Sequence, residues 1–142
     1  MAAVTPAEAL QKALRGEHAA LYLYGVLGAQ ASESRQPELV ARLEEGYDAH
    51  RAARDELTAL VSAKGLDPAP AEVSYELPGP TDTADQIEAV ARTIETRLTA
   101  TYGELVASTS GADRRWAIRA LDASALRELA LGAPARHFPG LE

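Results

Sequence analysis

The sequence contains no cysteine among its 142 residues, and this absence removes three classes of site. Without thiols there is no disulfide bond, no thiolate nucleophile and no cysteine-bound metal. The chain also lacks a basic N-terminal segment followed by an apolar one, and no apolar run approaches the length that spans a membrane. We therefore expect a cytoplasmic protein that does not interact with membranes.

Positive charge is scarce as well. Lys and Arg total 14 against 21 Asp and Glu, which gives a net charge of -7 and an isoelectric point of about 5.0. Such a chain has no global attraction to phosphate backbones, so nucleic acid is not expected as a partner. Gly-rich phosphate loops, nucleophile elbows and zinc-binding helix motifs are also absent.

What the sequence has in abundance is alanine and other helix-forming residues, whereas β-branched residues are few. With 46% hydrophobic residues, a chain of this length suits one compact domain over residues 1–142. Apolar periodicity and capping signals indicate an all-α domain. The helices are expected at about 5–30, 37–64, 83–109 and 111–131, followed by an irregular tail over 132–142.

The segment 65–82 is too rich in proline to form a regular helix. Its prolines are Pro68, Pro70, Pro78 and Pro80. Val73, Tyr75 and Leu77 alternate, so we expect the segment to lie extended with these side chains inward. At about 3 Å per residue it can follow a helix from end to end. This predicts a ferritin-like four-helix bundle with one long crossover between helices two and three, the alternative being an up-and-down bundle.

Ionisable side chains interrupt the apolar stripes of the predicted helices near their middles. Glu17 shares a stripe with Leu14 at about 100° per residue, and His50 lies on the stripe of the second helix. Counted from the turn between these helices, both lie at the same height, so antiparallel packing predicts that they face each other. The same count from the last turn pairs Glu95 with Arg127.

The inner face of the fourth helix is ambiguous in the sequence. One candidate face consists of Trp116, Ala120, Ala123, Arg127 and Ala130. The other consists of Ile118, Leu121, Ala125 and Leu129. In the tail that follows, Phe138 is the residue expected to hold the chain against the surface.

Charged side chains are rarely buried without partners, so the central ones are expected to form a polar cluster. Its expected members are Glu17, His50, Arg54, Glu95, Arg127 and Tyr47. Three interpretations are open. In the first, a satisfied network of Glu17, His50 and Arg54 fixes the helix register. In the second, a single metal ion is bound by Glu17 and His50, with Glu95 and a tyrosine. In the third, a small molecule docks beside the cluster.

A complete di-metal carboxylate centre is not expected. Such a centre takes a Glu from each of two helices and a Glu-x-x-His pair from each of the other two. Tyr47 stands where the glutamate of the pair ending at His50 would be, and the fourth predicted helix contains no histidine. A single metal ion is therefore the only cofactor that the sequence leaves open.

Several short motifs, in this order and spacing, resemble an uncharacterised ferritin-like family of bacterial proteins. They lie at residues 16–20 with Tyr22 and Tyr24-Gly25, and at 49–55, 115–117 and 138–141. The resemblance covers nearly the whole chain and implies a ferritin-like bundle. It assigns no chemistry to Glu17 or His50.

Taken together, the pattern predicts a binding or interaction module and favours no enzymatic activity. The alternative is a metal-binding protein or a small-molecule enzyme that uses Glu17 and His50. Apolar residues off the main stripes, such as Leu23 and Val26, would suit a subunit contact, so a homodimer is expected. The third interpretation of the cluster adds a small-molecule ligand.

Overall fold

Four α-helices make up all the regular structure of residues 3–141, which the computed structural model describes, and no strand occurs in this part of the chain. The helices are α1 (Pro6–Gln30), α2 (Pro37–Ala63), α3 (Ala84–Ser108) and α4 (Gly111–Ala130). Each end lies within one residue of the range expected from sequence.

Capping boxes define where α1 and α3 begin. The Thr5 hydroxyl accepts from the backbone N–H of Glu8 at 3.2 Å, and the Glu8 carboxylate accepts from the Thr5 N–H at 2.8 Å. Thr83 and Gln86 make the same reciprocal pair at the start of α3. Each box satisfies backbone donors that a helix start leaves unpaired.

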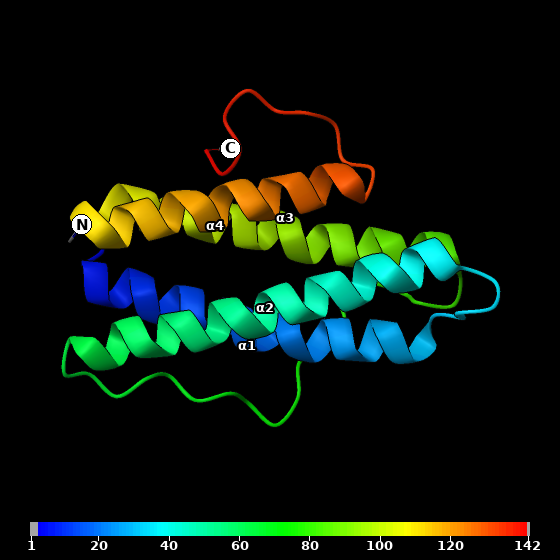
Figure 1. Ribbon diagram of the computed structural model, residues 1–142, viewed down its shortest axis with the longest axis horizontal. Helices are drawn as coiled ribbons and strands as arrows, with labels where there is room; N and C mark the ends of the chain where they lie inside the picture. Colours follow the sequence, from blue (N-terminus) through cyan, green and yellow to red (C-terminus); the bar gives the residue numbers. More distant parts are fainter. Residues whose placement is uncertain (1–2, 142) are drawn as a thin grey trace.

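The helices form two antiparallel hairpins, α1 with α2 and α3 with α4, which lie side by side (Figure 1). The hairpins meet mainly through α1 and α3, whereas α2 touches α3 and α4 at few positions. The largest fully buried apolar side chains come from the first three helices: Leu10, Leu14, Tyr24, Leu27, Leu43, Leu57, Val61, Tyr102 and Leu105. Leu23 also belongs to this core, so it is not available for the subunit contact that the sequence suggested.

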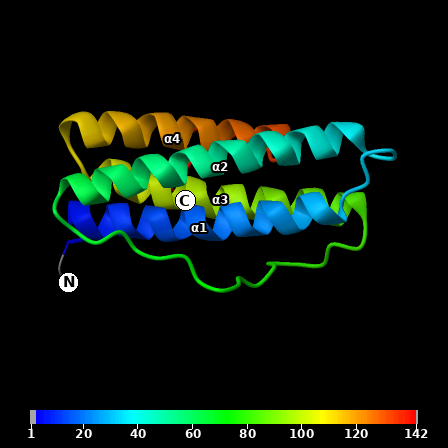
Figure 2. The same cartoon turned by 60° about the horizontal axis from the view of Figure 1, so that its bottom comes forward.

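The connection between α2 and α3, residues 64–83, runs along the bundle from one end to the other (Figure 2). Gln11 of α1 holds it there, because its side chain donates to the Asp67 carbonyl and accepts from the Ala69 N–H, both at 2.8 Å. The expectation that Val73 faces inward is wrong, because this side chain is 99% exposed. The chain bends at Val73, where the Tyr75 hydroxyl accepts from the backbone N–H of Glu72 at 2.9 Å.

The buried side of α4 lies between the two faces considered from sequence. Ala117, Ser124 and Glu128 are its buried residues, while Trp116, Ala120, Leu121 and Arg127 are half-buried. Ile118 and Leu129 of the second candidate face are exposed. Because α4 packs mainly on α3 and touches α2 at few positions, the residues on its side toward α2, such as Arg127, are only half-buried.

Phe138 does not hold the tail, because its side chain is 69% exposed. A terminal nitrogen of Arg136 instead donates to both carboxylate oxygens of Glu128, at 2.9 and 2.6 Å. Gly140 lies directly on Gly103 of α3, where a Cβ atom at Gly103 would come within 2.5 Å of the Gly140 carbonyl oxygen. Within residues 3–141, no helix has the length and apolar character needed to cross a bilayer.

Candidate functional site

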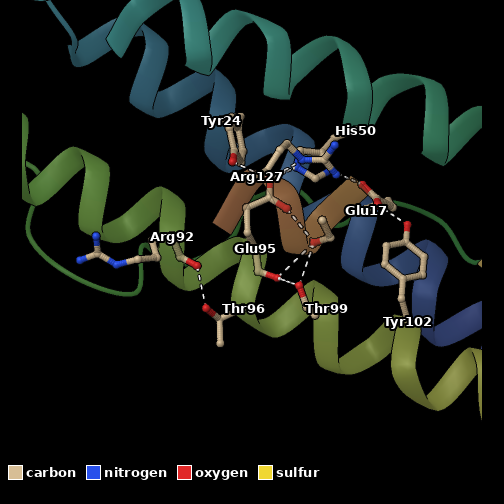
Figure 3. Close-up of polar contacts among 10 residues, drawn as sticks. Glu17, Tyr24, His50, Arg92, Glu95, Thr96, Thr99, Tyr102 and Arg127 are labelled. Atoms are coloured by element: carbon tan, nitrogen blue, oxygen red, sulfur yellow. Dashed lines mark hydrogen bonds and ion pairs between the residues drawn. The ribbon is translucent and has the colours of Figure 1, made fainter. Parts of the chain in front are cut away.

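A histidine between two carboxylates occupies the middle of the bundle (Figure 3). The Nδ1 atom of His50 lies 2.7 Å from Glu17 Oε2, and its Nε2 atom lies 2.7 Å from Glu95 Oε1. All three side chains have 0% exposure. Three helices therefore meet at one imidazole ring, α1 through Glu17, α2 through His50 and α3 through Glu95.

The surroundings of His50 favour its charged form. Burial alone lowers the pKa of an imidazole, but here the charges and hydrogen bonds of Glu17 and Glu95 outweigh it and raise the pKa of His50 to about 9. At neutral pH both ring nitrogens then carry hydrogen, and each donates to one carboxylate. Neither nitrogen has a lone pair free for a metal ion.

Glu95 has the largest number of partners in the network. Its Oε1 atom accepts from the Tyr24 hydroxyl at 2.6 Å and from Arg127 Nε at 2.9 Å, and its Oε2 atom accepts from Ser124 Oγ at 2.8 Å. Burial raises the pKa of a carboxyl group, but the hydrogen bond and charge of His50, aided by Arg127, lower the pKa of Glu95 to about 2. Glu95 is therefore ionised throughout the physiological range.

The other carboxylate, Glu17, accepts from the hydroxyl of Tyr102 on Oε1. Burial raises the pKa of both Tyr24 and Tyr102, so their hydroxyl groups remain protonated donors. No buried side-chain nitrogen or oxygen atom within residues 3–141 lacks a hydrogen-bond partner. The charges also balance, because the Glu17 and Glu95 carboxylates face the His50 imidazolium and the Arg127 guanidinium.

The structure brings together four of the six side chains predicted for the cluster: Glu17, His50, Glu95 and Arg127. Arg54 is not part of the network, because its Nε atom donates to Asp55 at 2.9 Å and its side chain is 30% exposed. A further buried cation would upset a balance that is already met. Tyr47 packs over Gly25 on the flank of α1 and α2 and makes no side-chain hydrogen bond within the described residues.

The sequence interpretation missed the hydroxyl groups that complete the network. Tyr24 and Tyr102 lie on the apolar stripes of their helices, where an aromatic residue is usually a core residue. The missed signal is that a buried tyrosine hydroxyl needs an acceptor. Ser124 and its neighbour Thr99, which donates to it at 3.2 Å, could not be assigned because the buried side of α4 was uncertain.

A groove between α2 and α4 leads to this network from outside. One hollow of about 240 Å³ has Glu17 and Tyr102 among its lining residues, together with alanines of both helices and Trp116. A second hollow of about 300 Å³ is lined by Tyr24, Gly46 and Leu131, among others. Ala123 and Arg127 line both hollows, so the two form one groove divided by these side chains.

The donor set does not suit a metal ion. Within residues 3–141, no group of three or more His, Asp or Glu side chains is arranged to hold one. The reason is visible at His50, whose ring separates Glu17 from Glu95 and occupies the space where a shared ion would have to lie. The metal-binding interpretation would require this ring to lose a proton and to move.

Comparisons with known proteins place the chain among proteins without an assigned role. A family model described as "Domain of unknown function (DUF4439)" matches residues 9–142. Among solved structures, the crystal structure of a conserved hypothetical protein, rv2844, from Mycobacterium tuberculosis is similar, with a TM-score of 0.80. The two chains are 28% identical, and the match covers 87% of this chain and 91% of that one. No curated protein matches.

Proposed function

The chain belongs to the DUF4439 family, and from this premise we propose that it is a small-molecule binding module. The module is a single ferritin-like domain over residues 1–142 whose centre contains charged side chains in place of metal ions. Its binding site is the groove between α2 and α4. Three observations support this: the path of the chain, the composition of the centre and the position of Arg127.

The path of the chain supports the ferritin-like assignment. The connection over residues 64–83 follows the length of the bundle, so that α2 and α3 run in the same direction (Figure 2). A four-helix bundle with one long crossover has this order of directions. An up-and-down bundle would instead make α2 and α3 antiparallel neighbours, and these two helices touch at few positions.

The composition of the buried network supports the proposal that the domain functions without a di-metal site. Glu17 on α1 and Glu95 on α3 match the two single glutamates of such a site. The positions of the two Glu-x-x-His pairs are taken here by Tyr47 with His50 on α2 and by Ser124 with Arg127 on α4. Each carboxylate therefore meets the positive charge of a protonated side chain, and the network is balanced without added cations.

The observation that carries the binding role is the position of Arg127. Its Nε atom is bound to the buried Glu95, while its side chain is 23% exposed and lines both hollows of the groove. A buried polar network that only stabilised the fold would not need a groove that exposes Arg127 to solvent. A concave site with alanine walls and few fixed polar groups is typical of small-molecule pockets.

Trp116 offers a direct test, because it is the only tryptophan of the chain and lines the smaller hollow. Benzyl alcohol, a small neutral aromatic probe, should change its fluorescence in a saturable way at millimolar concentration. Ala123→Leu places a larger side chain in both hollows and should abolish the change. Ala112→Leu, at an exposed position of the same helix, is the matched control and should not.

Amide chemical shifts measured during the same titration show where the probe binds. Shifts that cluster on the facing alanines of α2 and α4 are expected: Ala49, Ala52, Ala53, Ala120 and Ala123. A probe response that is scattered over the surface, or that survives Ala123→Leu unchanged, would contradict the groove as a binding site.

Metal binding is the second candidate function, and Glu17 with His50 beside the smaller hollow is the observation that favours it. Protein purified without added metal can be analysed for iron, manganese and zinc. We expect none at a stoichiometric level. A stoichiometric metal that is lost in Glu17→Ala would support this second function and overturn the first.

A further inference from the structure

We propose that the natural ligand of the groove is a small organic acid whose carboxylate is bound by the terminal nitrogens of Arg127. Its apolar body would lie in the smaller hollow, between the alanine walls and Trp116. This inference rests on the proposed function, because it names the ligand class for the same groove.

The first argument is the unused hydrogen-bonding capacity of Arg127. Its Nε atom donates to Glu95 Oε1 at 2.9 Å, and its two terminal nitrogens make no hydrogen bond within residues 3–141. They are not buried, because no buried side-chain nitrogen in this part of the chain lacks a partner. A guanidinium fixed through Nε presents its outer N–H groups as a planar fork, which matches a carboxylate.

The second argument is that the acceptors around the smaller hollow are already occupied. Both oxygens of Glu17 accept hydrogen bonds, one from Tyr102 and one from His50. Glu56, on the α2 side, accepts from the Trp116 indole N–H. The groups with unused donors are arginines, because Arg119 also lines the hollow and makes no side-chain hydrogen bond within the described residues. A ligand that complements this lining must supply acceptors.

The third argument selects the smaller hollow over the larger one. In the larger hollow Arg42 is already committed, since it donates to the Ala130 carbonyl and pairs with Glu88. Glu45 also lines that hollow and has no side-chain hydrogen bond or ion pair within the described residues, whereas Glu56 beside the smaller hollow accepts from Trp116. A volume of about 240 Å³ lies below the usual range of drug-sized sites, so it limits the ligand to a small acid.

Benzoate and benzyl alcohol form a matched pair of probes, because they share a benzene ring and differ in the carboxylate. At fixed ionic strength, Trp116 fluorescence should show benzoate binding about tenfold more tightly, as expected for a charge-assisted hydrogen-bond pair. Arg127→Lys keeps the charge but removes the fork, so it should remove the preference for benzoate over benzyl alcohol. Arg114→Gln, at an exposed position of α4 outside the groove, is the control.

A measurement on the unaltered protein covers the case in which Arg127→Lys does not fold. Benzoate should shift the NMR signals of the Arg127 Nε–H and the Trp116 indole N–H together, at one dissociation constant. Equal binding of the two probes would overturn the carboxylate inference and leave the groove intact as a site. Binding of neither probe would contradict the proposed function itself. Preferential benzoate binding without a shift at Arg127 would place the acid elsewhere and overturn this inference.

Discussion

At the scale of residues, His50 joins the two halves of the buried network. Among residues 3–141 it is the one side chain that makes hydrogen bonds to both Glu17 and Glu95, and it does so from a third helix. Glu17 then accepts one further hydrogen bond, from Tyr102, and the hydroxyl groups of Tyr24 and Ser124 together with Arg127 complete the partners of Glu95. The cost of burying two anions is thus offset by one imidazolium in contact with both and by one guanidinium.

Replacing His50 by alanine should destabilise the protein strongly. The change leaves Glu17 and Glu95 in the interior without the cation between them, and breaking a buried pair in this way costs about 3 kcal/mol or more. Urea denaturation monitored by circular dichroism measures the loss. His137→Ala, at an exposed tail position, should change the free energy of unfolding very little. Equal effects of the two substitutions would show that His50 is not an essential partner.

Stability should also depend on pH through His50. The pKa of His50 is raised from 6.5 to about 9 in the folded protein, so folding binds its proton more tightly than the unfolded chain does. This stabilisation is fully present below about pH 6.5 and is lost as the pH rises through about 9. Urea denaturation across this range should show the decline, and His50→Gln should remove it.

Glu95 acts in the opposite direction at acid pH. Its pKa is lowered from 4.5 to about 2, so its contribution is present above about pH 4.5 and is lost as the pH falls through about 2. The free energy of unfolding should therefore be highest between these two limits. A stability maximum outside the range from about pH 4.5 to 6.5 would contradict the assigned charges.

At the scale of elements, α4 is the helix that contributes the fewest buried residues. Its three buried residues are Ala117, Ser124 and Glu128, two of them polar, so it adds little to the apolar core. It is held by α3, through Ser124 and Arg127 on Glu95, and leaves a groove toward α2. The weak apolar periodicity of α4 made its inner face ambiguous in the sequence. The same lack of large apolar side chains leaves the groove toward α2 open.

Two substitutions on α4 should convert the centre toward metal binding. Ser124→Glu with Arg127→His introduces a Glu-x-x-His pair on this helix and removes the guanidinium that balances Glu95. We expect the double variant to be less stable than the unaltered protein in chelator and to regain stability with Mn²⁺ or Zn²⁺. Thermal unfolding with and without metal measures this.

The unaltered protein is the control for that experiment, and its melting temperature should not respond to these metals. A folded double variant whose melting temperature does not respond to metal would contradict the proposal that Ser124 and Arg127 occupy the positions of metal ligands.

At the scale of the whole molecule, two exposed apolar side chains of α4 form the surface at which we expect a second copy to bind. Ile118 and Leu129 are 42% and 43% exposed and lie on one side of the helix, away from Arg127 and the groove. Leu23, in contrast, is used within the chain. A dimer formed through Ile118 and Leu129 would leave the groove accessible.

We expect a homodimer in solution, and light scattering should give twice the mass of the chain. Ile118→Glu should then produce a monomer, because it places a charge in the contact. Ala112→Glu, which also adds a charge at an exposed position of α4, should leave the dimer intact. A monomer of the unaltered protein over a wide concentration range would contradict this expectation.

Helix ends and helix register could be predicted from the sequence because they depend on local signals and on counting. The capping boxes at Thr5 and Thr83 set where two helices begin. Equal distances from a tight turn put two side chains of an antiparallel pair at one height. For that reason the sequence alone determined that Glu17 would meet His50 and that Glu95 would meet Arg127.

The tertiary structure decided everything that depends on packing between distant segments. It selected the buried side of α4, directed Val73 outward and Arg54 toward Asp55, and gave Tyr24 and Tyr102 their carboxylate acceptors. No local pattern encodes these outcomes, because each depends on which surface of a second helix lies opposite. The groove between α2 and α4 could not be predicted from the sequence for the same reason, because it exists only where these two helices do not pack against each other.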